Sequence, residues 1–175
     1  AASDVYKRQE KDSKFWVIKE LWGSADDQPS KRFLDKENMI HKVQIGYDVT
    51  IAFEPPIPFS YMHLKPKEEK EYKSKFQSQQ GNRTFLLKYN AKRVDNETVE
   101  TPAGTFEDAI HVTVDETFVF TNNQGDEINF TVLHHYWYHP KVNGLIKETF
   151  KSNIPNRGEV TGESILKEHK KEEKE

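Results

Sequence analysis

Residues 99–150 read VETPAGTFEDAIHVTVDETFVFTNNQGDEINFTVLHHYWYHPKVNGLIKETF, and this stretch decides the fold. In its first half, apolar side chains occupy alternating positions: Ile110, Val112, Val114, Phe118 and Phe120. After the turn-forming residues 122–126 (NNQGD), the alternation resumes at Ile128, Phe130, Val132, Tyr136 and Tyr138. A period of two over this length is typical of half-buried antiparallel strands. The stretch therefore predicts a long β-hairpin.

The register of this hairpin follows from its alternation, because a slip of one residue would turn one strand's side chains to the opposite face. Even positions must pair with even ones, so we expect three pairs: Phe120–Ile128, Phe118–Phe130 and Val112–Tyr136. One face then carries aromatic and aliphatic side chains with two polar exceptions, Glu116 and His134, which are offset along the strands. The opposite face is mixed and carries His111, Thr113, Asp115, Thr131, His135, Trp137 and His139.

The composition excludes several classes of protein. A chain of 175 residues is long enough to form one domain with a sizeable hydrophobic core. Its 26 basic and 29 acidic residues are interspersed, so no basic stripe is present and no nucleic acid is expected as a partner. The lack of cysteine excludes disulfides, thiol catalysis and thiolate metal sites. No run of about 18 apolar residues occurs, so we expect no transmembrane segment in this chain.

Three parts are expected along the chain. Residues 1–9 (AASDVYKRQ) include DVYKRQ, which resembles the translation of a sequencing-library transposon end, so we interpret them as a non-native scar. Residues 10–167 are expected to form a single β-rich domain. Residues 168–175 (EHKKEEKE) are expected to be a charged tail without a site. If the scar is real, any signal peptide or lipid-anchor cysteine of the natural chain would lie upstream of it.

Further strands are expected on both sides of the hairpin. Residues 14–22 and 85–91 are strand-like, and the alternation from Val43 to Phe53 predicts another strand with one buried face. The charge-rich residues 65–75 are expected to be a solvated turn, and Gly104 can take positive φ in a tight reversal. We therefore expect an all-β, mainly antiparallel fold, with about eight strands in a strongly curved sheet or open barrel and little helix.

Seven histidines raise the question of a metal site. His134 and His135 point to opposite faces of an extended strand, so they cannot share a metal ion. His135 and His139 share a face but lie about 13 Å apart, too far to bind one tetrahedral zinc ion as a pair. His111, on the neighbouring strand, is the one histidine that could join either of them. We expect no metal site, and a metal-dependent hydrolase is the least favoured function.

The sequence lacks the serine-hydrolase, zinc-protease, Walker and Rossmann motifs. We therefore expect no catalytic residue and no cofactor, and we interpret the protein as a non-enzyme. Glu116 is the one carboxylate on the apolar face of the hairpin, so burial could raise its pKa. A strand bend or bulge at Glu116 is the simpler explanation of its position.

Two further motifs resemble those of a known group of proteins. Residues 99–106 (VETPAGTF) are followed by residues 136–140 (YWYHP), and then by Val142 and residues 145–147 (LIK). Over about residues 40–165, the chain resembles TapB-like and related uncharacterised exported bacterial proteins with a PAGTF … YWYxP … VGLVK signature. The resemblance implies an antiparallel β-rich fold, similar to LolA/LolB-type lipid carriers, and export, often as a lipoprotein. Asn143 interrupts the Val-Gly step of the signature, so no specific role is transferred.

The aromatic face is a candidate ligand-binding surface, made of Val112, Phe118, Phe120, Phe130, Tyr136 and Tyr138. These side chains are ordinary core if other elements cover them, and line a pocket if the sheet curls around an unfilled space. We expect a periplasmic, outer-membrane-associated or secreted binding protein that carries an apolar or lipid-like ligand. The alternative is a structural or protein-interaction module of the envelope, which pairs a strand edge or the mixed face with a partner.

Overall fold

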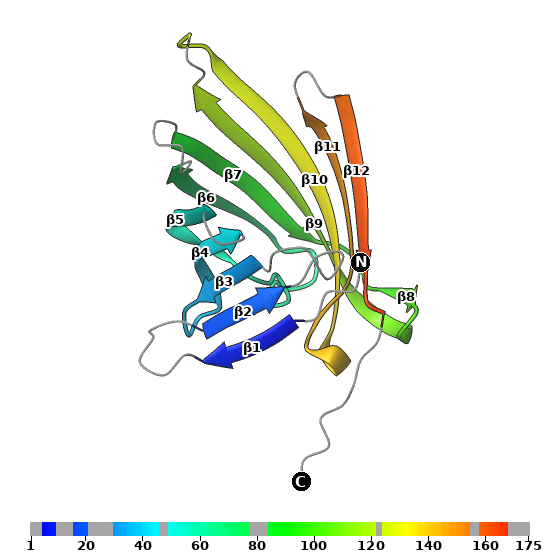
Figure 1. Ribbon diagram of the computed structural model, residues 1–175. Coiled ribbons are helices and arrows are strands. Elements are labelled where there is room, and N and C mark those ends of the chain that lie inside the picture. Colours follow the sequence, from blue (N-terminus) through cyan, green and yellow to red (C-terminus); the bar gives the residue numbers. More distant parts are fainter. Residues whose placement is uncertain are drawn as a thin grey trace.

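The computed structural model describes residues 5–9, 16–20, 30–45, 49–77, 84–121, 124–154 and 158–167, with 5–9, 16–20 and 154 described by backbone alone. In the described part of the chain, strands make up 77% and helix 2%, which confirms the all-β, antiparallel fold class. The sheet curls into a half-barrel (Figure 1). Its elements are β1 (Val5–Gln9), β2 (Trp16–Glu20), β3 (Ser30–Leu34), β4 (Met39–Ile45), β5 (Val49–Pro58), β6 (Glu69–Gln77), β7 (Thr84–Arg93), β8 (Glu97–Thr101), β9 (Gly104–Thr121), β10 (Glu127–His139), the short 3-10 helix η1 (Pro140–Val142), β11 (Gly144–Ile154) and β12 (Gly158–Ile165).

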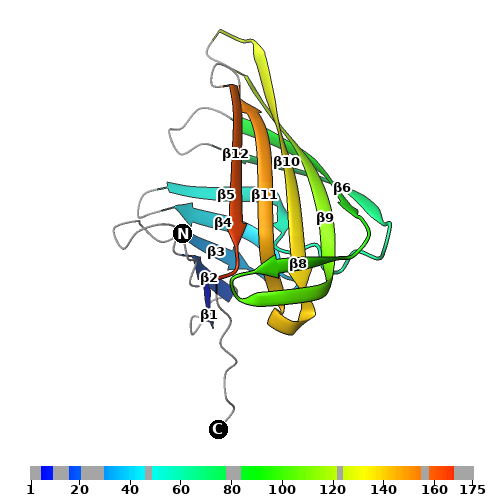
Figure 2. The same cartoon turned by 90° about the vertical axis from the view of Figure 1, so that its right-hand side faces the viewer.

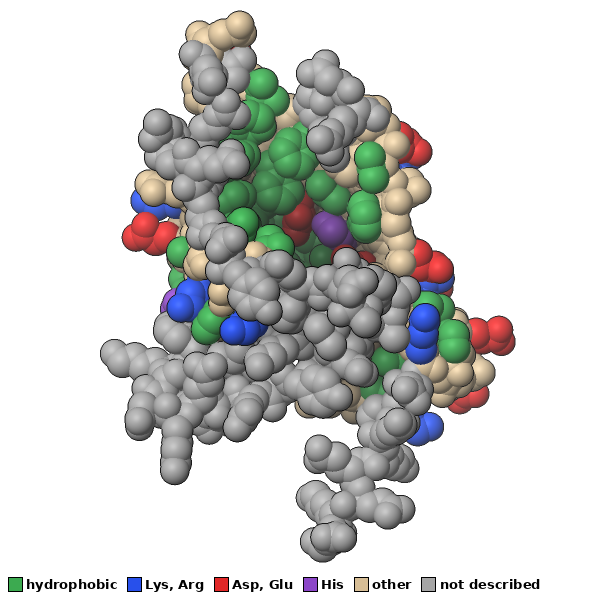
Figure 3. Space-filling model, viewed as in Figure 1, with side chains coloured by type: hydrophobic (Ala, Val, Ile, Leu, Met, Phe, Trp, Pro, Cys, Tyr) green, Lys and Arg blue, Asp and Glu red, His purple; other side chains and the backbone are tan. Residues whose placement is uncertain are grey.

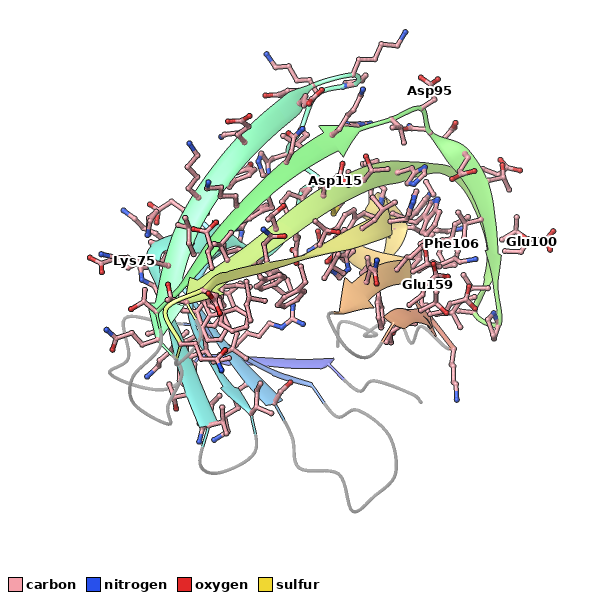
Figure 4. The ribbon with its side chains drawn as sticks, turned by 90° about the horizontal axis from the view of Figure 1, so that it is seen from above. Lys75, Asp95, Glu100, Phe106, Asp115 and Glu159 are labelled. Carbon is pink, nitrogen blue, oxygen red and sulfur yellow. The ribbon has the colours of Figure 1, made fainter. Side chains whose placement is uncertain are left out.

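Most strands pair with their neighbours in the sequence. The strand order is β1-β2-β3-β4-β5-β6-β7-β9-β10-β11-β12, and β8 lies off this path, where it pairs with β9. The described ranges contain twelve strands, more than the expected number of about eight. Seen from above, the long strands follow one arc, with Lys75, Asp95 and Glu100 on its outer side (Figure 4).

The sheet has two parts that meet where β5 passes into β6. In this ladder a single residue pair, Glu54–Lys75, joins the two strands. The Ser74 hydroxyl adds a bond across the junction by donating to the Pro55 carbonyl at 2.6 Å. The shorter strands β1–β5 form one wall of the half-barrel, and the long strands β9–β12 form the opposite wall (Figures 1 and 2). The weak junction lets the two walls face each other across the concave side.

The central hairpin is β9–β10, and its register confirms the prediction. All three expected pairs are formed: Phe120–Ile128, Phe118–Phe130 and Val112–Tyr136. Glu116 lies opposite Val132 and His134 lies opposite Val114, so the two polar exceptions are offset as expected. Strand β9 is 18 residues long and also pairs with β7 and β8, so it joins the hairpin to the rest of the sheet.

The alternation from Val43 to Phe53 belongs to two strands, so the prediction of a single strand was wrong. Strand β4 ends at Ile45 and β5 begins at Val49, and these two residues lie opposite each other in an antiparallel pair. Because odd residues pair with odd ones across the reversal, the period of two continues through it and hides it. Residues 46–48 lie outside the described residues.

Most of the expected turn at residues 65–75 is strand, so that prediction was also wrong. Strand β6 pairs with β7 along its whole length. Its inward side chains are Ser74, which is 2% exposed, and Tyr72 and Phe76, which pack against the core. Charged side chains fill most of the other positions of the strand. The prediction failed because three inward side chains suffice for an antiparallel strand whose other face is solvated, while the charges dominate the local composition.

The two ends of the chain can be compared with the scar and the tail that the sequence predicts. Residues 5–9 form the edge strand β1, which pairs with β2. Their interpretation as part of a non-native scar stays a prediction, because backbone pairing does not test the origin of a segment. The expected tail at residues 168–175 lies outside the described residues. In the part of the chain that the structure describes, no helix has the length and hydropathy needed to cross a membrane.

Candidate functional site

The concave side of the sheet carries the aromatic face of the hairpin. Of the six predicted residues, Val112 and Tyr138 are 0% and 4% exposed and belong to the hydrophobic core. The other four keep part of their surface exposed: Phe118, Phe120, Phe130 and Tyr136. Phe118, Phe120 and Phe130 lie toward the β9–β10 turn, and the buried pair lies toward the other end of the hairpin, with Tyr136 opposite Val112. The structure therefore divides the predicted surface into a filled part and an open part.

The connection between β5 and β6 fills the part around the buried pair, which we call the lower part. Tyr61 and Leu64 of this connection are 7% and 1% exposed, and they pack in one core cluster with Leu87, Tyr89, Val112 and Tyr138. The Arg93 guanidinium holds the connection in place by donating to the Leu64 carbonyl at 2.7 Å. The Tyr61 ring lies 5.9 Å from that of Tyr136. Tyr61 thus closes the space below the exposed rings.

Above this floor the concave face is hollow, and Figure 3 looks into it. Hydrophobic side chains line the hollow, and acidic and histidine side chains lie near its centre. One apolar wall is a series of ring contacts across four strands: Phe76–Phe85 at 4.9 Å, Phe76–Phe118 at 6.5 Å and Phe118–Phe130 at 4.8 Å. We call these four residues the phenylalanine ladder. Each of its rings keeps part of its surface exposed.

Phe150 of β11 lies on the same face as His134, with 6.0 Å between the ring centroids. Its ring rests against Gly162 of β12, the residue opposite it in the ladder. A Cβ atom added to Gly162 would come within 2.2 Å of Phe150 Cε1. Because glycine has no side chain, the Phe150 ring can occupy the space over Gly162, beside the hollow.

Replacing Gly162 by alanine should displace the Phe150 ring and lower the free energy of unfolding by about 1–3 kcal/mol. Gly144→Ala is the matched control, because its added Cβ would lie at 3.7 Å from the Val142 carbonyl oxygen, an ordinary contact. Urea denaturation measures both changes. In a Phe150→Ala background the cost of Gly162→Ala should disappear, and an equal cost in both backgrounds would contradict this explanation.

Three ionisable side chains meet on the concave face, one from each of three adjacent strands. His134 of β10 has Glu116 of β9 on one side and Glu148 of β11 on the other. His134 Nε2 lies 3.5 Å from Glu116 Oε2, and His134 Nδ1 lies 3.1 Å from Glu148 Oε1. The side chains are only 15–17% exposed. We call these three residues the Glu–His–Glu cluster.

The cluster holds a proton on His134 at neutral pH. Burial lowers the pKa of His134, but the hydrogen bonds and negative charges of Glu116 and Glu148 outweigh burial and raise it to about 9. The imidazole is therefore a cation, and both of its nitrogens face a carboxylate. Two carboxylates and one imidazolium give the cluster a formal charge of −1.

Tyrosine hydroxyls and one guanidinium surround the cluster. Burial raises the pKa of both Tyr61 and Tyr136 well above the usual value, and nearby tyrosines and glutamates raise it further. The positive charge of Arg32, which comes from β3, acts in the other direction on Tyr136 and Tyr138. These hydroxyls therefore stay neutral, and Arg32 faces the same space from the opposite wall.

Comparison of the chain with family models, curated proteins and solved structures gives no match. The resemblance to TapB-like exported proteins is neither supported nor refuted by this result, and it stays a prediction. The class of ligand that fits the hollow is therefore inferred from the side chains that line it.

The mixed face on the convex side holds a second network. His111 Nε2 lies 2.9 Å from His135 Nδ1, and His111 Nδ1 lies 3.1 Å from Glu97 Oε1. The Trp137 indole donates to Glu97 and stacks on His111 at 4.5 Å. Burial lowers the pKa of His111; Glu97 opposes this effect and His135 adds to it. Across the described ranges, no group of three or more His, Asp or Glu side chains is placed to hold a metal ion.

The histidines of β10 separate as their positions predict. His134 faces the concave side and His135 the convex side, since they contact Glu116 and His111 respectively. His139 has a structural role: its Nε2–H donates to the Glu107 carbonyl at 2.9 Å, and its Nδ1 accepts from the Lys141 amide at 3.1 Å. The second bond caps the first turn of η1. His135 and His139 therefore have different partners, as their separation requires.

Sequence reasoning missed Glu148, Phe150, Phe76 and Tyr61. A signal for Glu148 is present, because Ile146, Glu148 and Phe150 share one parity of the last long strand. A charged residue within an apolar series is also what singled out Glu116 and His134. Tyr61 gives no such signal, since it lies in a connection without periodicity.

Proposed function

We propose that this protein is a non-enzymatic binding protein that holds an apolar or lipid-like ligand in the hollow. The observation that carries the proposal is the partial exposure of the phenylalanine ladder above a filled core. Contiguous exposed apolar surface is unusual on a protein that acts alone, and it commonly marks a binding site. A concave apolar site with few polar groups is the usual form of a small-molecule pocket.

The Glu–His–Glu cluster is poorly suited to general-base catalysis by His134. A histidine that acts as a general base must be unprotonated near neutral pH, so that a ring nitrogen can accept a proton. His134 instead has a pKa of about 9 and stays protonated at neutral pH, with a carboxylate beside each ring nitrogen. The family resemblance implies export, and we propose an envelope or secreted location on that basis. Such a location agrees with a carrier that takes up lipid-like molecules.

The test is native mass spectrometry of the recombinant protein with lipid extraction, together with titration by the neutral dye Nile red. Phe130→Gln should weaken Nile red binding about tenfold, because one exposed ring of the ladder no longer covers the dye. Leu86→Gln is the matched control, since Leu86 is 37% exposed and lies next to the inward-facing Leu87 on the same strand. A folded protein that carries no ligand and binds no dye would refute the proposal.

A further inference from the structure

The two glutamates of the cluster are not held equally. Both glutamates face a ring nitrogen of His134, but Glu148 lies 3.1 Å from it and Glu116 makes the longer contact, at 3.5 Å. One imidazolium can neutralise only one of two carboxylates. A carboxylate that is only 17% exposed needs donors or a counter-charge to offset its loss of water. Glu116 is therefore the member of the cluster with unused capacity to accept hydrogen bonds.

A buried hydroxyl next to Glu116 also lacks a partner. Tyr89 lies directly opposite Glu116 in the β7–β9 pair and is 4% exposed. By distance and angle its hydroxyl makes no hydrogen bond to the described residues, although Tyr61 is close enough to act on it and oppose the rise of its pKa. Buried polar atoms in folded proteins are nearly always satisfied, so an exception indicates a missing partner. The negative charge of Glu116 acts on this hydroxyl and contributes to raising its pKa, after burial.

We propose that the ligand is an amphiphilic amine, whose ammonium group lies against Glu116 and the Tyr89 hydroxyl and whose apolar body lies along the phenylalanine ladder. This inference rests on the proposed function and adds the chemical class of the ligand. An ammonium group has three N–H donors, enough to reach Glu116, the Tyr89 oxygen and one water molecule. The aromatic rings beside the cluster favour a cation over an anion at the same place.

Arg32 is the group that an anionic ligand would contact in place of Glu116. Its charge reaches Tyr136 and Tyr138 from the opposite wall, and its guanidinium lies 5.8 Å from the Phe59 ring. An anionic amphiphile would place its head group at Arg32 and would have to approach the two glutamates. A negative head group near these carboxylates is unfavourable where water is scarce. We therefore favour the amine.

The experiment compares three ligands with the same chain and different ends: dodecylamine, dodecanol and dodecanoate. Each displaces Nile red from the full chain, so the dissociation constants are measured in one assay. Dodecylamine should bind at least about tenfold more tightly than dodecanol, since a charge-assisted hydrogen bond contributes at least this much. Dodecanoate should bind more weakly than dodecanol.

Two variants locate the head group. Glu116→Gln should bring dodecylamine to within about twofold of dodecanol, and Tyr89→Phe should weaken dodecylamine alone, by a smaller factor. Unchanged dodecanol binding shows that each variant is folded. Equal binding of the three ligands would overturn the inference and leave the proposed function standing. Preferred binding of dodecanoate, lost in Arg32→Met, would also overturn it. Failure of Nile red and dodecanol to bind at all would overturn both.

Discussion

Replacing Tyr61 by alanine should lower the free energy of unfolding by about 3–5 kcal/mol, the usual cost of deleting a large buried aromatic side chain. Tyr61 is 7% exposed, and its ring lies 5.9–6.5 Å from the rings of Tyr72, Tyr89 and Tyr136. The surrounding strands are paired on both sides and cannot collapse into the space that is left. Urea denaturation measures the loss, and Leu145→Ala, at a site that is 37% exposed, should cost less than about 1 kcal/mol.

The same substitution should also change the hollow. Without Tyr61 the exposed rings and the lower core share one space, so a longer ligand fits. Tyr61→Ala should therefore bind a longer-chain alcohol more tightly relative to dodecanol than the native protein does. Tyr61→Phe keeps the ring and should change neither stability by more than about 1 kcal/mol nor this ratio. A loss of stability equally large in Tyr61→Phe would contradict the explanation by packing.

The hairpin could be predicted from the sequence because its register has only one solution. Five aromatic side chains of one parity have to share a face, and any odd slip would expose them. The same argument placed Glu116 and His134 on the concave face and offset them. It could not reach Glu148, since the pairing of β11 depends on the turn at residues 140–143 and on an irregularity between Trp137 and Tyr138.

The division between core and hollow could not be predicted. Val112 and Phe118 have the same parity on the same strand, yet one is buried and the other is partly exposed. The difference comes from Tyr61 and Leu64, which reach the lower part of the sheet from a connection without any period. Alternation shows which side chains share a face, but the element that covers the face is set by the curvature of the whole sheet.

The free energy of unfolding should fall as the pH rises from about 6.5 to about 9, by at most about 3 kcal/mol, and His134→Gln should remove this fall. The pKa of His134 is 6.5 in an unfolded chain and about 9 in the fold. A raised pKa stabilises the fold fully below pH 6.5, and the stabilisation is lost as the pH approaches 9. The magnitude follows from about 1.36 kcal/mol for each tenfold change in proton affinity.

Urea denaturation at several pH values measures this slope, with the charged and titratable groups around His134 kept in place: Glu116, Glu148, Arg32 and Tyr136. His111 acts with the opposite sign, because its pKa is lowered, so stability is lost as the pH falls below 6.5. The two histidines therefore act in different ranges. A slope between pH 6.5 and 9 that persists in His134→Gln would show that another group titrates there.

The slope also offers a check on where an amine binds. A second positive charge beside Glu116 would compete with the proton on His134 and lower its pKa. With saturating dodecylamine, the fall in stability should therefore end at a lower pH and be smaller than in the free protein, whereas dodecanol should leave it unchanged. This coupling is reciprocal, so dodecylamine should bind more tightly to the form with neutral His134. Dodecanoate with its carboxylate at Arg32 would raise the local negative charge and move the end of the fall to higher pH.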